Sequence, residues 1–131
     1  PIHHFLDVKK ILELKRKNPG AKLIAHPECQ PELLEQADYI GSTKQLICYA
    51  KSDSCNCFIV ATEKGVLHQM KKDSPNKKFI IASNTLSCVN MKYTKLEDVY
   101  NVLSEETNEI FVDEEISKKA LKALDKMMEL S

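Results

Sequence analysis

Two short motifs about sixty residues apart contain the side chains best suited to chemistry: residues 26–29 (His-Pro-Glu-Cys) and 84–91, which include Cys88. A third motif, Gly-Ser-Thr at 41–43, lies between them. Each follows a predicted strand, and open α/β sheets bind their ligands at the carboxyl ends of parallel strands. A histidine, a carboxylate, two hydroxyls and a thiol at one edge of a sheet suit a metal site or an acid–base site.

The elements that must position these motifs follow from the hydrophobic pattern. Short apolar runs alternate with helical periodicity and are joined by short connections. This alternation predicts a parallel sheet covered by helices on both faces, a three-layer α/β/α fold. We predict strands at 22–26, 39–40, 55–61, 78–82 and 109–112, and helices at 8–18, 32–37, 42–50, 62–70, 94–103 and 113–130.

Helix-start signals and loop length refine this pattern. Ser42 and Gln45 form a capping box, Thr62 is predicted to cap the next helix, and Thr94 pairs with Glu97 in a second capping box. The loop at 83–94 is the longest connection, which makes it the first candidate for function.

Composition bounds the class of protein. A chain of 131 residues with balanced charge predicts one soluble domain and argues against a nucleic-acid-binding protein, which would carry a basic face. No apolar run approaches the length of a membrane span, and no signal peptide is visible, so we expect a cytoplasmic protein. Five cysteines, an odd number, argue against a disulfide framework.

His26 and Glu28 flank a proline that restricts the preceding residue to extended geometry, which fixes two polar side chains at a strand end. Glu28 is a candidate general base or metal-facing carboxylate, and His26 a candidate for binding an anion or shuttling protons. The alternative is that His26 caps the strand and Glu28 caps the next helix.

The other two motifs also have alternative interpretations. Ser42 and Thr43 begin a helix, where free backbone N–H groups attract anions, but an ordinary capping box explains the same residues. Cys88 is a candidate iron or zinc ligand, yet one cysteine cannot hold a metal alone. Cys29 is also interpreted as a small buried hydrophobic residue.

Several segments share the order and spacing of one known family: residues 26–29, 37–43 (Ala-Asp-Tyr-Ile-Gly-Ser-Thr), 58–63 (Phe-Ile-Val-Ala-Thr-Glu), 67–68 (Leu-His), 88–91 (Cys-Val-Asn-Met) and 112–116 (Val-Asp-Glu-Glu-Ile). By these motifs the chain resembles the quinolinate synthase family. The resemblance covers essentially all of residues 1–131 and corresponds to the C-terminal part of the family's length, including its third α/β domain.

The resemblance implies three similar α/β domains around a central cavity, each giving one cysteine to a [4Fe-4S] cluster whose fourth iron acts as a Lewis acid. The implied reaction condenses iminoaspartate with dihydroxyacetone phosphate to quinolinate. By resemblance, Cys88 is the last cluster ligand, and Glu28 and His26 are both catalytic and substrate-binding residues. Ser42 and Thr43 are then donors to a substrate anion.

The resemblance also implies a substrate-binding histidine near the start of the chain. His3 fits the family's Cys-x-x-His segment if the cysteine falls just before Pro1, and His4 is the rival alignment. Two of the three cluster cysteines are therefore absent, so we expect an enzyme whose site is completed by the rest of the same enzyme. The alternatives are a non-catalytic anion-binding module and a zinc protein using Cys29, Cys88 and His26.

Overall fold

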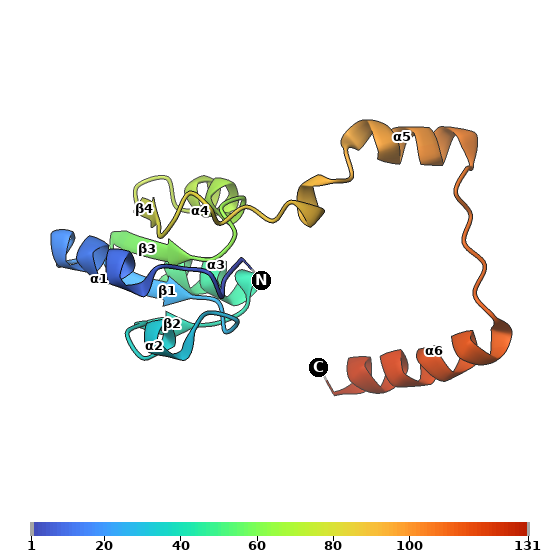
Figure 1. Cartoon of the computed structure of the whole chain (residues 1–131), viewed down its shortest axis with the longest axis horizontal. Helices are drawn as coiled ribbons and strands as arrows, with labels where there is room; N and C mark the ends of the chain where they lie inside the picture. Colours follow the sequence, from blue (N-terminus) through green and yellow to red (C-terminus); the bar gives the residue numbers. More distant parts are fainter. Residues whose placement is uncertain (1, 131) are drawn as a thin grey trace. The chain divides into compact units, whose positions relative to one another are not determined.

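The computed structural model describes residues 2–130, in which one parallel sheet organises the first part of the chain. Its strands are β1 (Lys22–Ala25), β2 (Tyr39–Ile40), β3 (Cys57–Ala61) and β4 (Lys78–Ile81), in the order β2-β1-β3-β4 (Figure 1). Ala25 lies opposite both Ile40 and Ala61, and Val60 lies opposite Ile81. All four carboxyl ends therefore meet at the same edge of the sheet.

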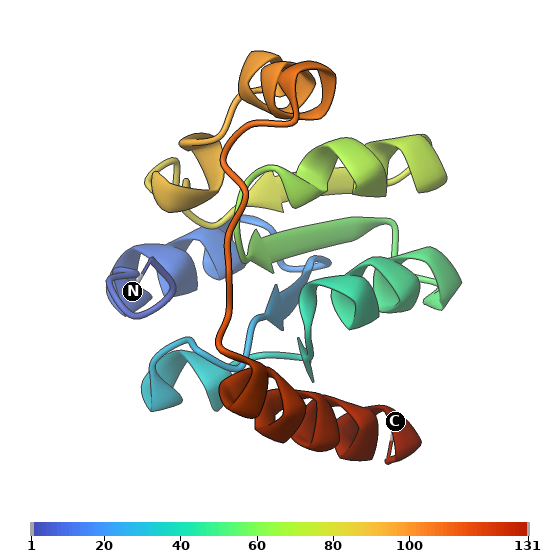
Figure 2. The ribbon, with the colours of Figure 1, turned by 90° about the vertical axis from the view of Figure 1, so that its right-hand side faces the viewer.

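Helices cover both faces of the sheet, which confirms the predicted three-layer α/β/α fold (Figure 2). Helices α1 (Val8–Lys17) and α2 (Pro31–Leu34) lie on one face, and α3 (Thr43–Ser52) and α4 (Val66–Asp73) lie on the other. The predicted capping box of α3 is present, because Ser42 Oγ accepts from Gln45 N–H and Gln45 Oε1 accepts from Ser42 N–H.

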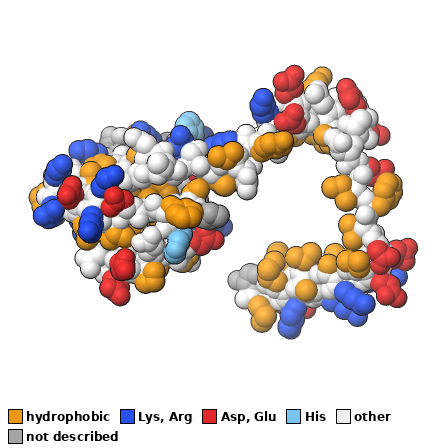
Figure 3. All heavy atoms as spheres, viewed as in Figure 1, with side chains coloured by type: hydrophobic (Ala, Val, Ile, Leu, Met, Phe, Trp, Pro, Cys, Tyr) orange, Lys and Arg blue, Asp and Glu red, His pale blue; other side chains and the backbone are white. Residues whose placement is uncertain are grey.

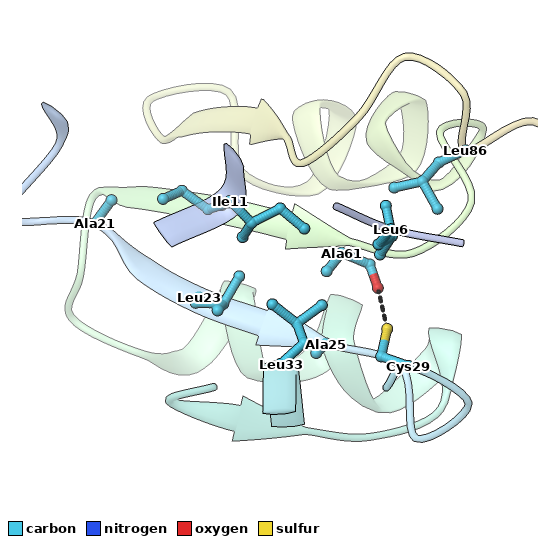
Figure 4. Close-up of a cluster of buried hydrophobic side chains, with 10 residues drawn as sticks. Leu6, Ile11, Ala21, Leu23, Ala25, Cys29, Leu33, Ala61 and Leu86 are labelled. Atoms are coloured by element: carbon cyan, nitrogen blue, oxygen red, sulfur yellow. Dashed lines mark hydrogen bonds between the residues drawn. The ribbon is translucent and has the colours of Figure 1, made fainter. Parts of the chain in front are cut away.

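The core is divided by the sheet into two clusters of buried side chains. The cluster under α1 and α2 includes Leu23, Ile59 and Leu86 (Figure 4). The cluster under α3 and α4 includes Phe58 and Met70. Strand β3 contributes to both clusters because its alternate side chains point to opposite faces, which explains its continuous apolar run.

The chain divides into two compact units, residues 1–91 and 92–131. A short 3-10 helix, η1 (Asn90–Lys92), is followed by α5 (Leu96–Glu105) and α6 (Glu114–Glu129). Not one residue from 92 to 130 is buried. Hydrophobic side chains line one side of α6 in Figure 3.

Three sequence predictions are wrong in this structure. Residues 109–112 form no strand, because no other described strand pairs with them and an isolated strand cannot satisfy its backbone hydrogen bonds. Thr62 caps no helix, since α4 begins later with Gly65 as its N-cap. The start of α5 uses Asp98, whose carboxylate accepts from Lys95 N–H at 2.8 Å, in place of Thr94 and Glu97.

No helix among residues 2–130 is both long and apolar enough to cross a lipid bilayer.

Candidate functional site

The motif at 26–29 folds as a tight turn directly after β1. Cys29 N–H donates to His26 O at 3.0 Å, and Pro27 occupies the second position, where its fixed φ favours such a turn. Cys29 anchors the turn, because its buried thiol donates to Ala61 O at 3.5 Å (Figure 4). The turn thereby displays Glu28, whose side chain is 65% exposed.

Burial also decides the chemistry of Cys29. Its surroundings raise the pKa of the thiol to about 11, so the sulfur stays protonated near neutral pH. A protonated thiol is a poor nucleophile. Cys29 therefore serves as an anchor, in agreement with its interpretation as a small buried residue.

His3 lies against this turn and is nearly buried, with 9% of its surface exposed. Its Nδ1 is 3.0 Å from Glu28 Oε2, and its Nε2 is 3.3 Å from Thr62 Oγ1. The imidazole rings of His3 and His26 stack with centroids 4.4 Å apart and planes 11° apart. Residues 3, 26, 28 and 62 thus form one contiguous group, which we call the histidine–carboxylate cluster.

The hydrogen bonds of the cluster assign its protons. An ionised carboxylate can only accept, so His3 Nδ1–H donates to Glu28. Thr62 O–H then donates to the bare Nε2 of a neutral His3. His26 Nδ1 accepts from Glu28 N–H at 3.3 Å, which leaves the proton of a neutral His26 on Nε2.

Electrostatics supports the same assignment. The hydrogen bond from His3 lowers the pKa of Glu28 below its ordinary value, which keeps the carboxylate ionised. Burial lowers the pKa of His26, and the neighbouring His3 lowers it further, which keeps that imidazole neutral. The cluster therefore offers a carboxylate that can accept a proton beside a neutral imidazole that can donate a hydrogen bond through Nε2–H.

The cluster lies at a special point of the sheet. The chain proceeds from β1 to β2 on one side, and β3 and β4 lie on the other side of β1. The strand order reverses between β1 and β3, and open α/β sheets bind ligands outside the carboxyl ends of strands at such a switch point. His26 follows β1 and Thr62 follows β3, so the cluster flanks the switch point.

Ser42 and Thr43 follow β2, one strand from the cluster and at the same edge of the sheet. Both are exposed. The N–H group of Ser42 is used by the capping box, while the N–H groups of Thr43 and Lys44 in the first turn of α3 have no partner within the helix. The exposed hydroxyl of Thr43 and these two N–H groups suit an anion.

Cys88 lies in the loop after β4 and is partly buried. Leu86 is fully buried, and its carbonyl accepts from Lys64 N–H at 2.8 Å, which joins this loop to the segment that follows Thr62. Cys48 lies exposed on α3, and Cys55 and Cys57 lie at the amino end of β3, away from the edge with the cluster. Among the described cysteines, Cys29 and Cys88 follow the carboxyl ends of strands. Cys29 is buried, whereas Cys88 is only partly buried.

One ligand atom each from His3, His26 and Glu28 lies within 4.8 Å of the others, which raises the question of a metal ion. The parallel stacking of the two rings directs their lone pairs side by side and not toward a common point. Both nitrogens of His3 are also occupied by hydrogen bonds. The geometry therefore favours proton transfer over metal binding within this cluster.

Thr62 is the residue of the cluster that sequence reasoning missed, because a threonine before a helical pattern predicts a cap. The available signal was its place directly after the buried run of β3. Of the two N-terminal histidines, the structure brings His3 into the cluster and leaves His4 exposed. His68 is exposed on α4, as its polar neighbours predict.

Fold and site together define an α/β protein with a histidine–carboxylate cluster at the switch point of its sheet. Residues 1–129 match the family model described as Quinolinate synthetase A protein. The chain therefore belongs to the quinolinate synthetase A family.

Curated relatives agree with this assignment. The chain is 44% identical over 128 residues to a quinolinate synthase from Alkaliphilus metalliredigens, covering 98% of this chain and 42% of that protein. It is 42% identical over 129 residues to a quinolinate synthase from Clostridioides difficile, with the same two coverages. A quinolinate synthase from Trichodesmium erythraeum is 44% identical over 135 residues, covering 99% of this chain and 42% of that protein. The chain thus spans about two-fifths of the length of these relatives.

Proposed function

We propose that this chain supplies the acid–base part of a quinolinate synthase site. In this proposal the complete protein condenses iminoaspartate with dihydroxyacetone phosphate to give quinolinate, a step of NAD biosynthesis. The observation that carries the proposal is the histidine–carboxylate cluster at the switch point. The names of the relatives supply the product, quinolinate, and the family resemblance supplies the two substrates.

The cluster suits what such a condensation demands of a protein. Forming and dehydrating the ring requires protons to be removed from carbon and nitrogen and delivered to departing oxygen atoms. Glu28 is the base, because it is ionised and its side chain is exposed. Neutral His26 donates a hydrogen bond through Nε2–H to a substrate oxygen. Thr43 and the start of α3, with Ser42 as its cap, bind a carboxylate or phosphate of the substrates.

We further propose that Cys88 gives one thiolate to a [4Fe-4S] cluster. The donor chemistry fits a share of such a group, since iron–sulfur clusters are held by cysteine thiolates and Cys88 is a free thiol at the edge with the acid–base residues. When bound, the [4Fe-4S] cluster supplies a Lewis-acidic iron. Its remaining ligands come from the rest of the same enzyme. Free cysteines also suit the reducing environment of the cytoplasm, where we place the protein.

The role of Glu28 is tested by Glu28→Gln in the complete protein, with iron and quinolinate both measured. We expect iron content to be unchanged and turnover to fall by about 100-fold or more, as for loss of a general base. Glu32→Gln, a change at an exposed carboxyl in α2, is the control and should keep full turnover. Near-normal turnover of Glu28→Gln would remove Glu28 from the reaction.

The role of Cys88 is tested by anaerobic iron–sulfur reconstitution of the complete protein carrying Cys88→Ser. We expect loss of the iron and sulfide that the parent takes up, because serine supplies no thiolate. Cys48→Ser, which changes an exposed thiol on α3, should take up as much iron and sulfide as the parent. Equal iron and sulfide in the two variants would refute the ligand assignment.

A further inference from the structure

His3 is placed to act on Glu28 and not on a substrate. The resemblance gives it a substrate-binding role, but its ring is nearly buried and both nitrogens are engaged inside the chain. A histidine without a free nitrogen offers a substrate no polar contact. The segment that carries it is also fixed, since Leu6 is buried in the core and the Gln30 side-chain amide donates to His4 O.

Glu28 gains two properties from this contact. The hydrogen bond holds Oε2, so the carboxylate is fixed in one orientation while its side chain remains largely exposed. A donor aimed at the charged form also favours ionisation. The result is an oriented carboxylate with Oε1 left for a proton from the substrate.

Thr62 supports His3 from the opposite side. Thr62 is 1% exposed, and its hydroxyl oxygen lies 3.3 Å from Nε2. A hydroxyl can donate to a bare nitrogen or, after rotating, accept from N–H. His3 therefore keeps both partners whether it is neutral or protonated, and its ring does not need to move.

We propose that His3 is a positioning residue that orients Glu28 through Nδ1–H, with the Thr62 hydroxyl holding the far side of the ring through Nε2. The catalytic meaning of this arrangement rests on the proposed function of Glu28, whereas the arrangement itself is a property of the chain. Among residues 2–130, the titratable groups that hydrogen-bond to His3 or stack on its ring are Glu28 and His26, both from the turn after β1; Thr62, from the segment after β3, does not titrate.

The unmutated 131-residue chain provides the first test, by nitrogen-15 NMR of its histidine rings near neutral pH. We expect Nδ1 of His3 to carry a proton under all conditions in which the chain is folded, with Nε2 bare in the neutral form. A neutral His3 protonated only at Nε2 would overturn the proposal. This readout needs neither substrate nor iron, so it stands even if the protein makes no quinolinate.

Two matched pairs of variants provide the second test, read by carbon-13 NMR titration of the Glu28 carboxyl. The amide nitrogen of asparagine replaces Nδ1, so His3→Asn should keep the hydrogen bond to Glu28 and a low pKa of that carboxyl. The amide nitrogen of glutamine replaces Nε2 instead, so His3→Gln should raise the pKa of Glu28 toward its ordinary value. Thr62→Ser should leave the pKa of Glu28 as it is in the parent. Thr62→Val should raise this pKa, but by less than His3→Gln does. A pKa of Glu28 that is the same in all four variants would contradict the positioning role.

Kinetics of the complete protein separates positioning from substrate binding. We expect His3→Gln to lower kcat by about 10- to 100-fold, the usual consequence of a displaced catalytic group, with little change in KM. The acidic limb of the pH profile should move to higher pH in this variant, because Glu28 must be ionised to act. His3→Asn should retain most of kcat. A raised KM with unchanged kcat in His3→Gln would identify a substrate contact and overturn the proposal.

Discussion

The two units of the chain show the same helical patterns but differ in what those patterns bury. In residues 2–91 each apolar stripe packs on the sheet, and side chains such as Leu23 and Phe58 are completely covered. In residues 92–130 the stripes of α5 and α6 stay exposed, with Leu103 at 75% and Leu121 at 53%. Amphipathic periodicity therefore predicts a helix in both units, while burial and the chemistry that depends on it require long-range partners.

The largest expected effect comes from shortening a leucine in each unit. Leu23→Ala should lower the free energy of unfolding by about 2–5 kcal/mol, because it removes a fully buried side chain beneath α1 and α2. Leu121→Ala should change it by less than about 0.5 kcal/mol, as for an exposed position. Urea unfolding followed by circular dichroism measures both. Equal losses would mean that the two units are packed alike.

Removing one helix cap in each unit should have a smaller effect. Asp7 accepts from Lys10 N–H at the start of α1, and Asp113 accepts from the N–H groups of Glu115 and Ile116 at the start of α6. Each change to alanine should weaken its own helix by about 1 kcal/mol. Asp7→Ala should lower the unfolding midpoint of residues 2–91, and Asp113→Ala should reduce the helical signal of α6. An unchanged helical signal in Asp113→Ala would show that this cap does not support α6.

The smallest expected effect at neutral pH concerns the ion pair between Lys22 and Asp53, whose atoms Nζ and Oδ2 are 2.5 Å apart. The hydrogen bond from Lys22 lowers the pKa of Asp53 to about 2. A lowered carboxyl pKa stabilises the fold above the unfolded value of about 4, and this contribution is lost as pH falls from about 4 to 2. Water screens the pair because Lys22 remains partly exposed.

Acid unfolding tests this pair. Asp53→Asn should flatten the loss of stability between about pH 4 and 2, since the variant has no carboxyl to protonate at this position. Asp125→Asn, a change on α6, is the matched control in the other unit and should leave the acid limb unchanged. An identical acid limb in the parent and in Asp53→Asn would show that the pair does not contribute.

Local signals predicted most of the fold. The apolar run at β3 and the Ser-x-x-Gln pattern at Ser42 each determine their element from neighbouring residues. The run at 109–112 carries the same strand signal, but a strand also needs a partner, and the pattern of four residues contains no information about one. This is why one strand prediction failed where four succeeded.

The candidate site was predicted only where its residues are close in sequence. His26 and Glu28 are displayed by one turn, which the proline already indicates. His3 reaches Glu28 across 25 residues and Thr62 across 59, and no local pattern encodes such contacts. The resemblance to a family pointed to His3, but the structure shows that both of its nitrogens are engaged within the chain.

Quinolinate formation by the complete, anaerobically iron-reconstituted protein tests the central claim most directly. The protein would be mixed with iminoaspartate and dihydroxyacetone phosphate, and the product would be identified by mass spectrometry. The account predicts quinolinate formation that requires both substrates and falls by about 100-fold or more with Glu28→Gln. A folded, iron-loaded protein that yields no quinolinate would contradict it.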